Sequence, residues 1–128
     1  MKVLIDTHVI LWAGLSPAQL SKRARTILAD RSNEVLLSAA SAWEIATKVR
    51  LGKLPGAERL EHEFISSVEE AGYTLLSITA AHALRAGRLA GDHRDPFDRM
   101  IAAQALAEDI PILSIDTKLD SFGIRRTW

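Results

Sequence analysis

The sequence predicts an α/β fold in three layers, α/β/α, with a mostly parallel sheet of four to five strands between the helices. The first observation behind this prediction is that short apolar runs alternate with longer segments of helical periodicity. The second is that these runs are almost continuously apolar, as strands buried on both faces are. The third is the length, because 128 residues, 48% of them hydrophobic, suffice for one core. We therefore expect residues 1–128 to form a single domain.

The first half of the chain alternates between strands and helices. An apolar run ends at Asp6, which places this residue at the carboxyl end of a strand. Ser16 and Pro17 are typical of a helix N-cap and of the first helical position, so we expect a helix to start there. The expected elements are a strand at 2–5, helices at 7–15 and from 17 onward, a strand at 35–38 and a helix at 39–50.

The second half continues this alternation. Gly72 is a typical helix stop, and Thr79 and Asp95 are typical helix N-caps. The expected elements are a helix at 57–71, a strand at 73–78, a helix at 80–86, a loop at 87–94, a helix at 96–108, a strand at 110–115 and a short edge strand within 123–128.

Composition limits the cellular setting and the chemistry. No apolar run approaches the roughly 20 residues of a membrane helix, and the start of the chain turns acidic too early for a signal peptide. We therefore expect a cytoplasmic protein with no membrane partner. The chain has no cysteine, which excludes disulfides and thiolate metal sites. A bound metal would use oxygen or imidazole ligands, which favours Mg²⁺ or Mn²⁺.

The net charge of zero is unusual for a protein that binds nucleic acid. If four of the 16 acidic residues hold a metal, however, 12 remain against 16 basic residues, which is a modest basic excess. The basic residues cluster at 22–25, 48–53, 85–99 and 125–126. Such clusters are either phosphate contacts or ordinary solvated faces, and the sequence leaves both interpretations open.

Two aspartates follow expected strands. Asp6 comes directly after the first strand, and Asp116 comes directly after the strand at 110–115. The carboxyl ends of parallel strands meet at one edge of the sheet, where ligand sites of α/β folds lie, so both acids should face one crevice. Taken singly, each aspartate could merely start a turn.

Two further acids lie on expected helices. Asp98 is the third residue of the helix that Asp95 caps, where an acid suits either the helix dipole or a metal site. Its neighbour Arg99 should point toward solvent. Glu44 lies nearly opposite the apolar stripe of its helix, so periodicity favours a surface pair with Lys48 at i+4.

Four sequence blocks, taken in order, resemble PIN-domain nucleases of the VapC-type toxin class. The blocks are VLIDTHVILW at 3–12, SAWEIATKVRLGKL at 41–54, DPFDRMIAAQA at 95–105 and ILSID at 112–116. Each block alone is weakly specific, but four blocks in register with a matching strand and helix pattern are quite specific. The resemblance covers essentially the whole chain and implies a PIN-like fold.

The resemblance also implies a set of functional residues and partners. It places catalytic acids at Asp6, Glu44, Asp98 and Asp116, with Asp6, Asp98 and Asp116 as metal ligands, and so moves Glu44 from a surface pair to the site. It implies an endoribonuclease that hydrolyses RNA with Mg²⁺ or Mn²⁺. It further implies the toxin of a type II toxin–antitoxin pair, which is held inactive by a cognate antitoxin and forms a homodimer.

Electrostatics explains why such a cluster needs metal. Two carboxylates 4 Å apart repel by about 4 kcal/mol at an effective dielectric constant near 20, so four together require cations or bound protons. A divalent cation also lowers the pKa of a bound water and stabilises the departing oxygen in phosphodiester hydrolysis.

Other side chains near these acids have ordinary structural explanations. His8 is expected to be packed or a polar filler rather than a ligand. Trp12 and Trp43 are expected to anchor the core or an interface rather than to stack on bases. Thr7 and Ser38 should hydrogen-bond the acids rather than bind metal. The residues whose roles stay open are Asp92, His93 and Asp95.

Two other classes of function are alternatives. An aspartate after the first strand also occurs in haloacid-dehalogenase-like phosphatases and in receiver domains. The phosphatases normally have a second aspartate where His8 stands, and the acidic pair of receiver domains is missing. The non-enzymatic alternative is a catalytically inactive PIN-like interaction module, against which the presence of all four acids argues. The apolar segments 9–12 and 20–28 are either antitoxin contacts or core, because both have this apolar pattern.

Overall fold

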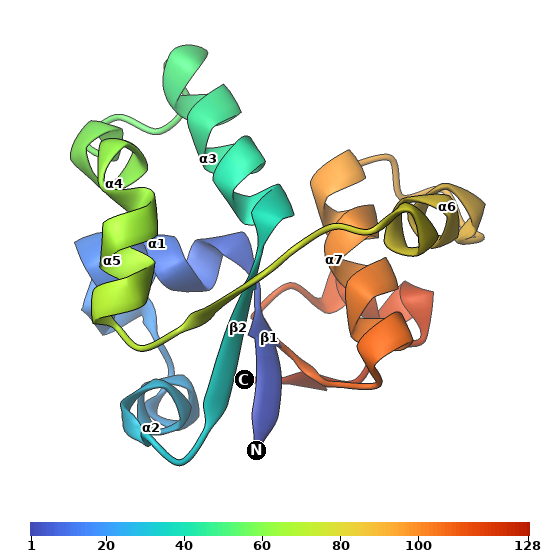
Figure 1. The fold of residues 1–128 in the computed structure, drawn as a ribbon, viewed down its shortest axis with the longest axis horizontal. Coiled ribbons are helices and arrows are strands. Elements are labelled where there is room, and N and C mark those ends of the chain that lie inside the picture. Colours follow the sequence, from blue (N-terminus) through green and yellow to red (C-terminus); the bar gives the residue numbers. More distant parts are fainter.

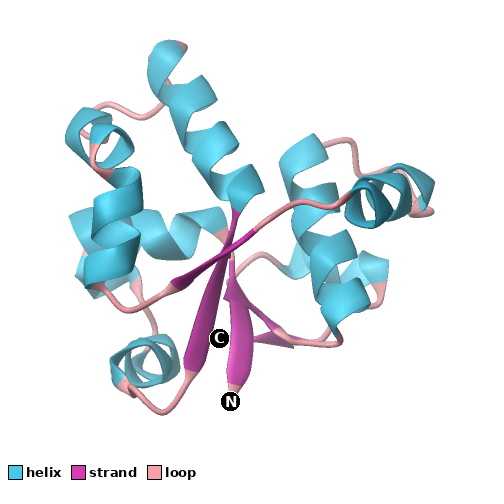
Figure 2. Cartoon of the chain, in the orientation of Figure 1, coloured by secondary structure: helices cyan, strands magenta, loops and turns pink.

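The computed structural model describes residues 1–128, and its fold is drawn in Figure 1. Five strands form one sheet in the order β3-β2-β1-β4-β5, and every neighbouring pair is parallel. Helices lie on both sides of this sheet, as Figure 2 shows. The predicted α/β fold with a parallel sheet is therefore confirmed. The strands are β1 (Lys2–Ile5), β2 (Glu34–Ser38), β3 (Thr74–Leu76), β4 (Ile112–Leu113) and β5 (Arg126–Thr127).

The helices divide into two groups around the sheet. In Figure 1, α1, α2, α4 and α5 lie on one side, α6 and α7 lie on the other, and α3 continues beyond the end of β2. No helix combines the length and apolarity needed to span a membrane. The helices are α1 (Thr7–Leu15), η1 (Pro17–Gln19), α2 (Lys22–Ala29), α3 (Ala39–Arg50), α4 (Glu58–His62), α5 (Phe64–Glu70), α6 (Ala80–Arg88), α7 (Pro96–Glu108) and η2 (Thr117–Phe122).

Alternation along the central strand separates two hydrophobic clusters. Val3 and Ile5 belong to the cluster on the α1 and α2 side, whereas Leu4 belongs to the cluster on the α7 side. All three side chains are fully buried. Burial of each contributes about 1.5–3 kcal/mol relative to exposure, so the two clusters hold the helical layers to the sheet.

The register of the strands brings their carboxyl ends to one edge. Ile5, the last residue of β1, pairs with Leu37 on β2 and with Leu113 on β4. Asp6 and Ser114, which follow these strands, therefore emerge side by side. Three helices begin near the same edge: α1 follows β1, α3 directly follows β2, and the N-terminal end of α7 lies close by (Figure 1).

The helix expected from Ser16 onward is divided, so this prediction was wrong. Ser16 makes no side-chain cap, and only the short 3-10 helix η1 follows it. The true N-cap is Ser21, whose hydroxyl accepts a hydrogen bond from the Ala24 backbone N–H at 3.0 Å and starts α2. Leu20 lies between the two helices with an extended backbone. Its side chain is buried, so it anchors the segment between the helices in the core.

Several other boundaries also differ from the sequence prediction. The helix expected at 57–71 breaks at Glu63 into α4 and α5. The strands expected at 73–78 and 110–115 are shorter in the structure, and the 3-10 helix η2 was not predicted. The N-caps Thr79 and Asp95 are confirmed, and both accept backbone hydrogen bonds through their side chains.

Candidate metal site at the carboxyl edge of the sheet

Asp6 is held in a buried position at the end of β1, where its residue is only 4% exposed. Its carboxylate Oδ2 accepts a 2.7 Å hydrogen bond from the Ser114 hydroxyl. Burial raises the pKa of Asp6, and the charge of Glu44 adds to this increase. The hydrogen bond from Ser114 and the charge of His8 oppose the rise without cancelling it.

Glu44 is buried as well, with 3% of the residue exposed, so the surface position favoured by periodicity was wrong. Helix α3 contacts both α1 and α7, and Trp43, next to Glu44, meets Phe97 of α7, so α7 lies on the side of α3 away from the apolar stripe. The predicted pair with Lys48 does form, with 2.5 Å between Lys48 Nζ and Glu44 Oε2. The other carboxylate oxygen, Oε1, is buried without a hydrogen-bond partner. An unpartnered buried oxygen is expensive in free energy and is therefore a natural place for a cation or a water.

Asp98 is free for chemistry because its neighbour Asp95 does the capping. Asp95 Oδ1 accepts hydrogen bonds from the backbone N–H groups of Phe97 at 2.9 Å and Asp98 at 3.1 Å. The Asp98 carboxylate instead pairs with His93, with 2.8 Å between Oδ2 and Nε2. The structure thus confirms Asp95 as the N-cap and gives His93, whose role was open, that of a partner of Asp98.

The pKa of the partly exposed Asp98 is affected by the buried acids. Burial is the largest cause of a rise to about 6, which the hydrogen bond from His93 opposes. The charges of Asp95, Asp6 and Glu44 raise the pKa further. Carboxylates from the end of β1, from α3 and from α7 therefore lie within electrostatic reach of one another.

Asp116 lies at the same edge but is turned to other partners. Its backbone N–H donates to the Ser114 hydroxyl at 3.0 Å, and its Oδ1 accepts from the Lys118 backbone N–H at 2.9 Å. The pKa of Arg126 is raised chiefly by its hydrogen bond to Asp120, and the charge of Asp116 contributes as well. Asp116 is thus connected to Asp6 through Ser114, while its carboxylate caps η2.

The donor set matches a hard divalent cation. All four predicted acids offer carboxylate oxygens, which Mg²⁺ and Mn²⁺ prefer. In the conformation observed, no three carboxylate or imidazole side chains enclose a common metal position. Glu44 Oε1 is nevertheless unpartnered, and the charge of Glu44 adds to the effect of burial in raising the pKa of both Asp6 and Asp98. A cation at this edge would satisfy both features.

Arg99 supports the site instead of pointing to solvent, so that prediction was wrong. Its guanidinium is half-buried and donates to the backbone carbonyls of Ala86 at 3.1 Å, of His93 at 3.0 Å and of Leu89. Its planar group also lies 5.8 Å from the ring centroid of Phe122. Arg99 therefore ties the end of α6 and the following loop to α7.

Ser114 is the site residue that the sequence interpretation missed. The only sequence signal was a serine two positions before Asp116 in the block ILSID. Thr7 and Ser38 were expected to bond the acids, and the Thr7 backbone does lower the pKa of Asp6 through a hydrogen bond, but both side chains have other partners. Thr7 Oγ1 lies 2.9 Å from the hydroxyl of Ser41, and the Ser38 hydroxyl bonds the Gln104 side chain.

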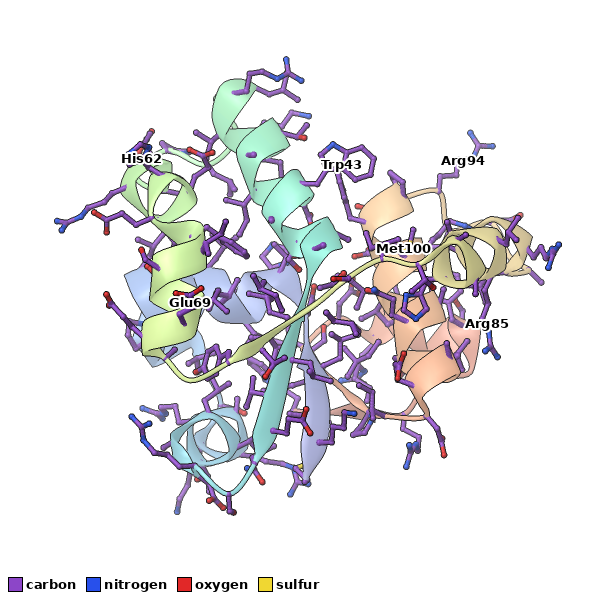
Figure 3. All side chains as sticks on the ribbon, viewed as in Figure 1. Trp43, His62, Glu69, Arg85, Arg94 and Met100 are labelled. Carbon is purple, nitrogen blue, oxygen red and sulfur yellow. The ribbon has the colours of Figure 1, made fainter.

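Trp12 and Trp43 differ in environment. Trp12 packs against the larger hydrophobic cluster and contacts Trp128 edge to face, with 5.9 Å between the ring centroids. Trp43 is 58% exposed, so it is not a core residue. Its ring meets Phe97 edge to face at 4.7 Å. Figure 3 shows it between α3 and the N-terminal end of α7.

Comparison with known proteins agrees with the fold and with the sequence resemblance. The model of the PIN domain family matches residues 3–124. Ribonuclease VapC16 of Mycobacterium tuberculosis is 43% identical over 65 residues, which are 51% of this chain and 46% of that protein. The match thus spans less than half of this relative's length.

Solved structures with similar folds have lower sequence identity and inform on the fold alone. VapBC2 from Rickettsia felis, bound to a DNA fragment of its promoter, superposes with a TM-score of 0.72 at 16% identity and covers 99% of this chain and 98% of its own. Mycobacterium tuberculosis VapC20, a sarcin-ricin loop cleaving toxin, has a TM-score of 0.67 at 17% identity and 95% coverage of both chains. FitAcB from Neisseria gonorrhoeae has a TM-score of 0.64 at 22% identity, with coverage of 98% and 96%.

These matches contradict a phosphatase or receiver domain, because the model of the PIN domain family spans nearly the whole chain and VapBC2 superposes over 99% of it. With its buried acids at the carboxyl edge of a five-stranded parallel sheet, the chain belongs to the PIN domain family.

Proposed function

We propose that this protein is a metal-dependent endoribonuclease and the toxin of a toxin–antitoxin pair. One observation carries the proposal: carboxylates from three distant segments meet at one edge of the sheet, where the charges of the buried Asp6 and Glu44 both raise the pKa of Asp98. Grouping acids in this way is unfavourable without a compensating cation. The named relative, a ribonuclease, supports RNA as the substrate.

Asp6 and Asp98 would be the principal ligands of Mg²⁺ or Mn²⁺. When bound, the metal supplies Lewis-acid activation of the attacking water and stabilises the oxygen that leaves. Ser114 fixes the Asp6 carboxylate through their 2.7 Å hydrogen bond. Asp98 would exchange its contact with His93 for the metal, since that pair lies at the partly exposed side of the site.

Glu44 and Asp116 have different supporting roles in this proposal. Glu44 Oε1 has no partner and can accept a hydrogen bond from the attacking water, which orients that water toward the phosphorus. Asp116 acts through a water or through Ser114, because its carboxylate is already engaged by the Lys118 backbone N–H.

An antitoxin would bind an apolar groove between α1 and the α4 and α5 helices. Most of the apolar residues considered for this contact are core, since Val9 and Ile27 are buried. The groove has a volume of about 480 Å³, and its lining includes Ile10, Leu60 and Phe64. Several similar structures are toxin–antitoxin complexes, which supports a protein partner for this fold.

A homodimer would use exposed apolar side chains at the β3 edge of the sheet. Leu75 on this edge strand is 38% exposed, and Ile78 and Leu84, which follow it, are 37% and 55% exposed. An edge strand with exposed apolar residues is a ready surface for self-association. Sedimentation of the purified protein would measure the oligomeric state.

The test of the proposed function is RNA cleavage by the purified protein in Mg²⁺, in Mn²⁺ and in EDTA. We expect cleavage with either metal and none with the chelator. Asp6→Asn and Asp98→Asn should each reduce the rate by roughly a hundredfold or more, because each removes a charged ligand. Asp30→Asn is the matched control, since Asp30 is exposed and bonds only to Ser32. Undiminished cleavage in EDTA would remove the metal mechanism. An absence of cleavage under every condition would favour the inactive interaction module.

A further inference from the structure

Lys48 occupies an unusual place among the basic residues of the chain. It is the one lysine or arginine that forms an ion pair with any of the four predicted catalytic acids, through Nζ and Glu44 Oε2 at 2.5 Å. The Glu44 side chain is 5% exposed and that of Lys48 is 30% exposed. The ammonium therefore sits at the boundary between a buried carboxylate and solvent.

The ammonium of Lys48 also faces acids on a second helix. Burial lowers the pKa of Lys48, but the hydrogen bond and charge of Glu44 outweigh this effect, and the charges of Asp95 and Asp98 add to the rise. One cation on α3 is thus shared by acids of α3 and α7. Without it, Glu44 would be a buried carboxylate with neither oxygen paired.

A divalent metal and Lys48 would compete for the same negative charge. A metal bound beside Glu44 would repel the ammonium and weaken the Lys48 to Glu44 pair. The side chain has a flexible four-carbon stem, so its ammonium can move while α3 stays fixed. In a nuclease, the nearest new anion would be the phosphate brought to the metal, and lysine is a common point-charge ligand of phosphate.

We propose that Lys48 has two positions: it neutralises Glu44 when no metal is bound, and it contacts a nonbridging oxygen of the RNA phosphate when metal and substrate are present. This inference rests on the proposed nuclease function and adds a substrate-binding residue to it. The first position keeps the buried acids stable in the absence of metal. The second places positive charge on the substrate side of the site.

The first arm of the test measures Mn²⁺ affinity by calorimetry without RNA. Lys48→Met removes the competing cation, so Mn²⁺ should bind more tightly, by about threefold to tenfold. Lys48→Arg keeps the charge and should bind Mn²⁺ like the unaltered protein. Arg50→Met is the matched control, because Arg50 is exposed on the same helix and pairs with no acid. Circular dichroism would verify that each variant is folded.

The second arm uses a single-stranded RNA that the unaltered protein cleaves and the same RNA with an uncharged methylphosphonate at the cleaved linkage. Lys48→Met should raise KM for the normal RNA by about tenfold, the effect of one lost phosphate contact. It should leave the inhibition constant of the methylphosphonate RNA unchanged. A structural defect in the variant would weaken the binding of both RNAs alike.

The outcomes separate this inference from the proposed function. If the unaltered protein cleaves RNA but Lys48→Met changes neither Mn²⁺ affinity nor KM, the Lys48 proposal is wrong and the nuclease function stands. If Lys48→Met weakened the binding of both RNAs equally, the proposed phosphate contact would also be wrong. If the unaltered protein cleaves no RNA in any metal, the proposed function fails and the phosphate contact fails with it.

Discussion

The Ser114 hydroxyl donates a 2.7 Å hydrogen bond to Asp6 Oδ2 and so joins the ends of the neighbouring strands β4 and β1. This bond works against the effect of burial, which raises the pKa of Asp6. We expect Ser114→Ala to raise that pKa further and to leave the carboxylate less well oriented. Mn²⁺ affinity and kcat/KM should each fall by about tenfold to a hundredfold, as for other residues that orient metal ligands. Ser121→Ala is a suitable control, because that exposed hydroxyl bonds only a backbone carbonyl.

Asp116 should matter less than Asp6 or Asp98. Its carboxylate caps η2 by accepting from the Lys118 N–H, whereas the charges that add to burial in raising the pKa of Asp98 are chiefly those of Asp95, Asp6 and Glu44. We expect Asp116→Asn to lower the cleavage rate by roughly tenfold, against a hundredfold for Asp98→Asn, which steady-state kinetics would measure. Equal losses in the two variants would indicate that Asp116 binds the metal directly.

The stability of the metal-free protein should depend on pH through Asp98. Its folded pKa of about 6 lies above the ordinary aspartate pKa of 3.8, so the folded state binds more protons than the unfolded state between these values. The stabilisation of the fold by the protonated Asp98 carboxyl group is therefore fully present below about pH 4. It is lost as the pH rises through about 6. Asp98→Asn removes this loss and should raise the free energy of unfolding at pH 8 by about 1 to 3 kcal/mol. Urea denaturation in EDTA at pH 5 and pH 8 would measure the effect, and a variant less stable than the unaltered protein at pH 8 would contradict it.

Gln104 should contribute strongly to folding stability because it is fully buried and joins two segments. Its Oε1 accepts from the Ser38 hydroxyl, and its Nε2 donates to the Ser77 backbone carbonyl at 3.2 Å. Gln104→Leu would leave both groups unpaired and should lower the free energy of unfolding by about 2 to 4 kcal/mol. Gln19→Leu provides the comparison, since Gln19 is exposed and should change stability by less than about 0.5 kcal/mol.

Arg99→Lys should loosen the loop that follows α6. A lysine ammonium cannot reproduce the planar guanidinium that donates to the carbonyls of Ala86, Leu89 and His93. We expect a loss of about 1 to 3 kcal/mol in the free energy of unfolding and faster tryptic cleavage after Arg94. Limited proteolysis with mass analysis would identify the cut, and Arg85→Lys, on the exposed face of α6, should leave its rate unchanged.

The sequence predicted those features that depend on local chemistry or on simple periodicity. Continuous apolar runs located the strands, because parallel strands covered on both faces exclude polar residues. The N-caps Thr79 and Asp95 were predicted because a cap needs only its own side chain and the next turn. The prediction of an α-helix after Ser16 was wrong because Pro17 suits a 3-10 turn as well as an α-helix. The α-helix begins after Ser21, whose side chain caps it.

Features that depend on packing between distant segments were not predictable in this way. Helical spacing placed Glu44 on the surface, but α7 covers that face of α3, and only the family resemblance placed Glu44 in the site. Arg99 was assigned to solvent for a similar reason, because the carbonyls that it binds belong to the preceding helix and loop. The bond from Ser114 to Asp6 spans most of the chain and has no local signature.

The position of β4 also bears on when the site becomes complete during synthesis. β1 is made early, yet its neighbour β4 and the Ser114 hydroxyl follow it by more than 100 residues, since Asp6 and Ser114 lie 108 positions apart. A nascent chain that has not yet extended past residue 114 therefore lacks both the adjacent strand and the donor that holds Asp6. The surroundings of the Asp6 carboxylate are complete only after both segments have left the ribosome and paired.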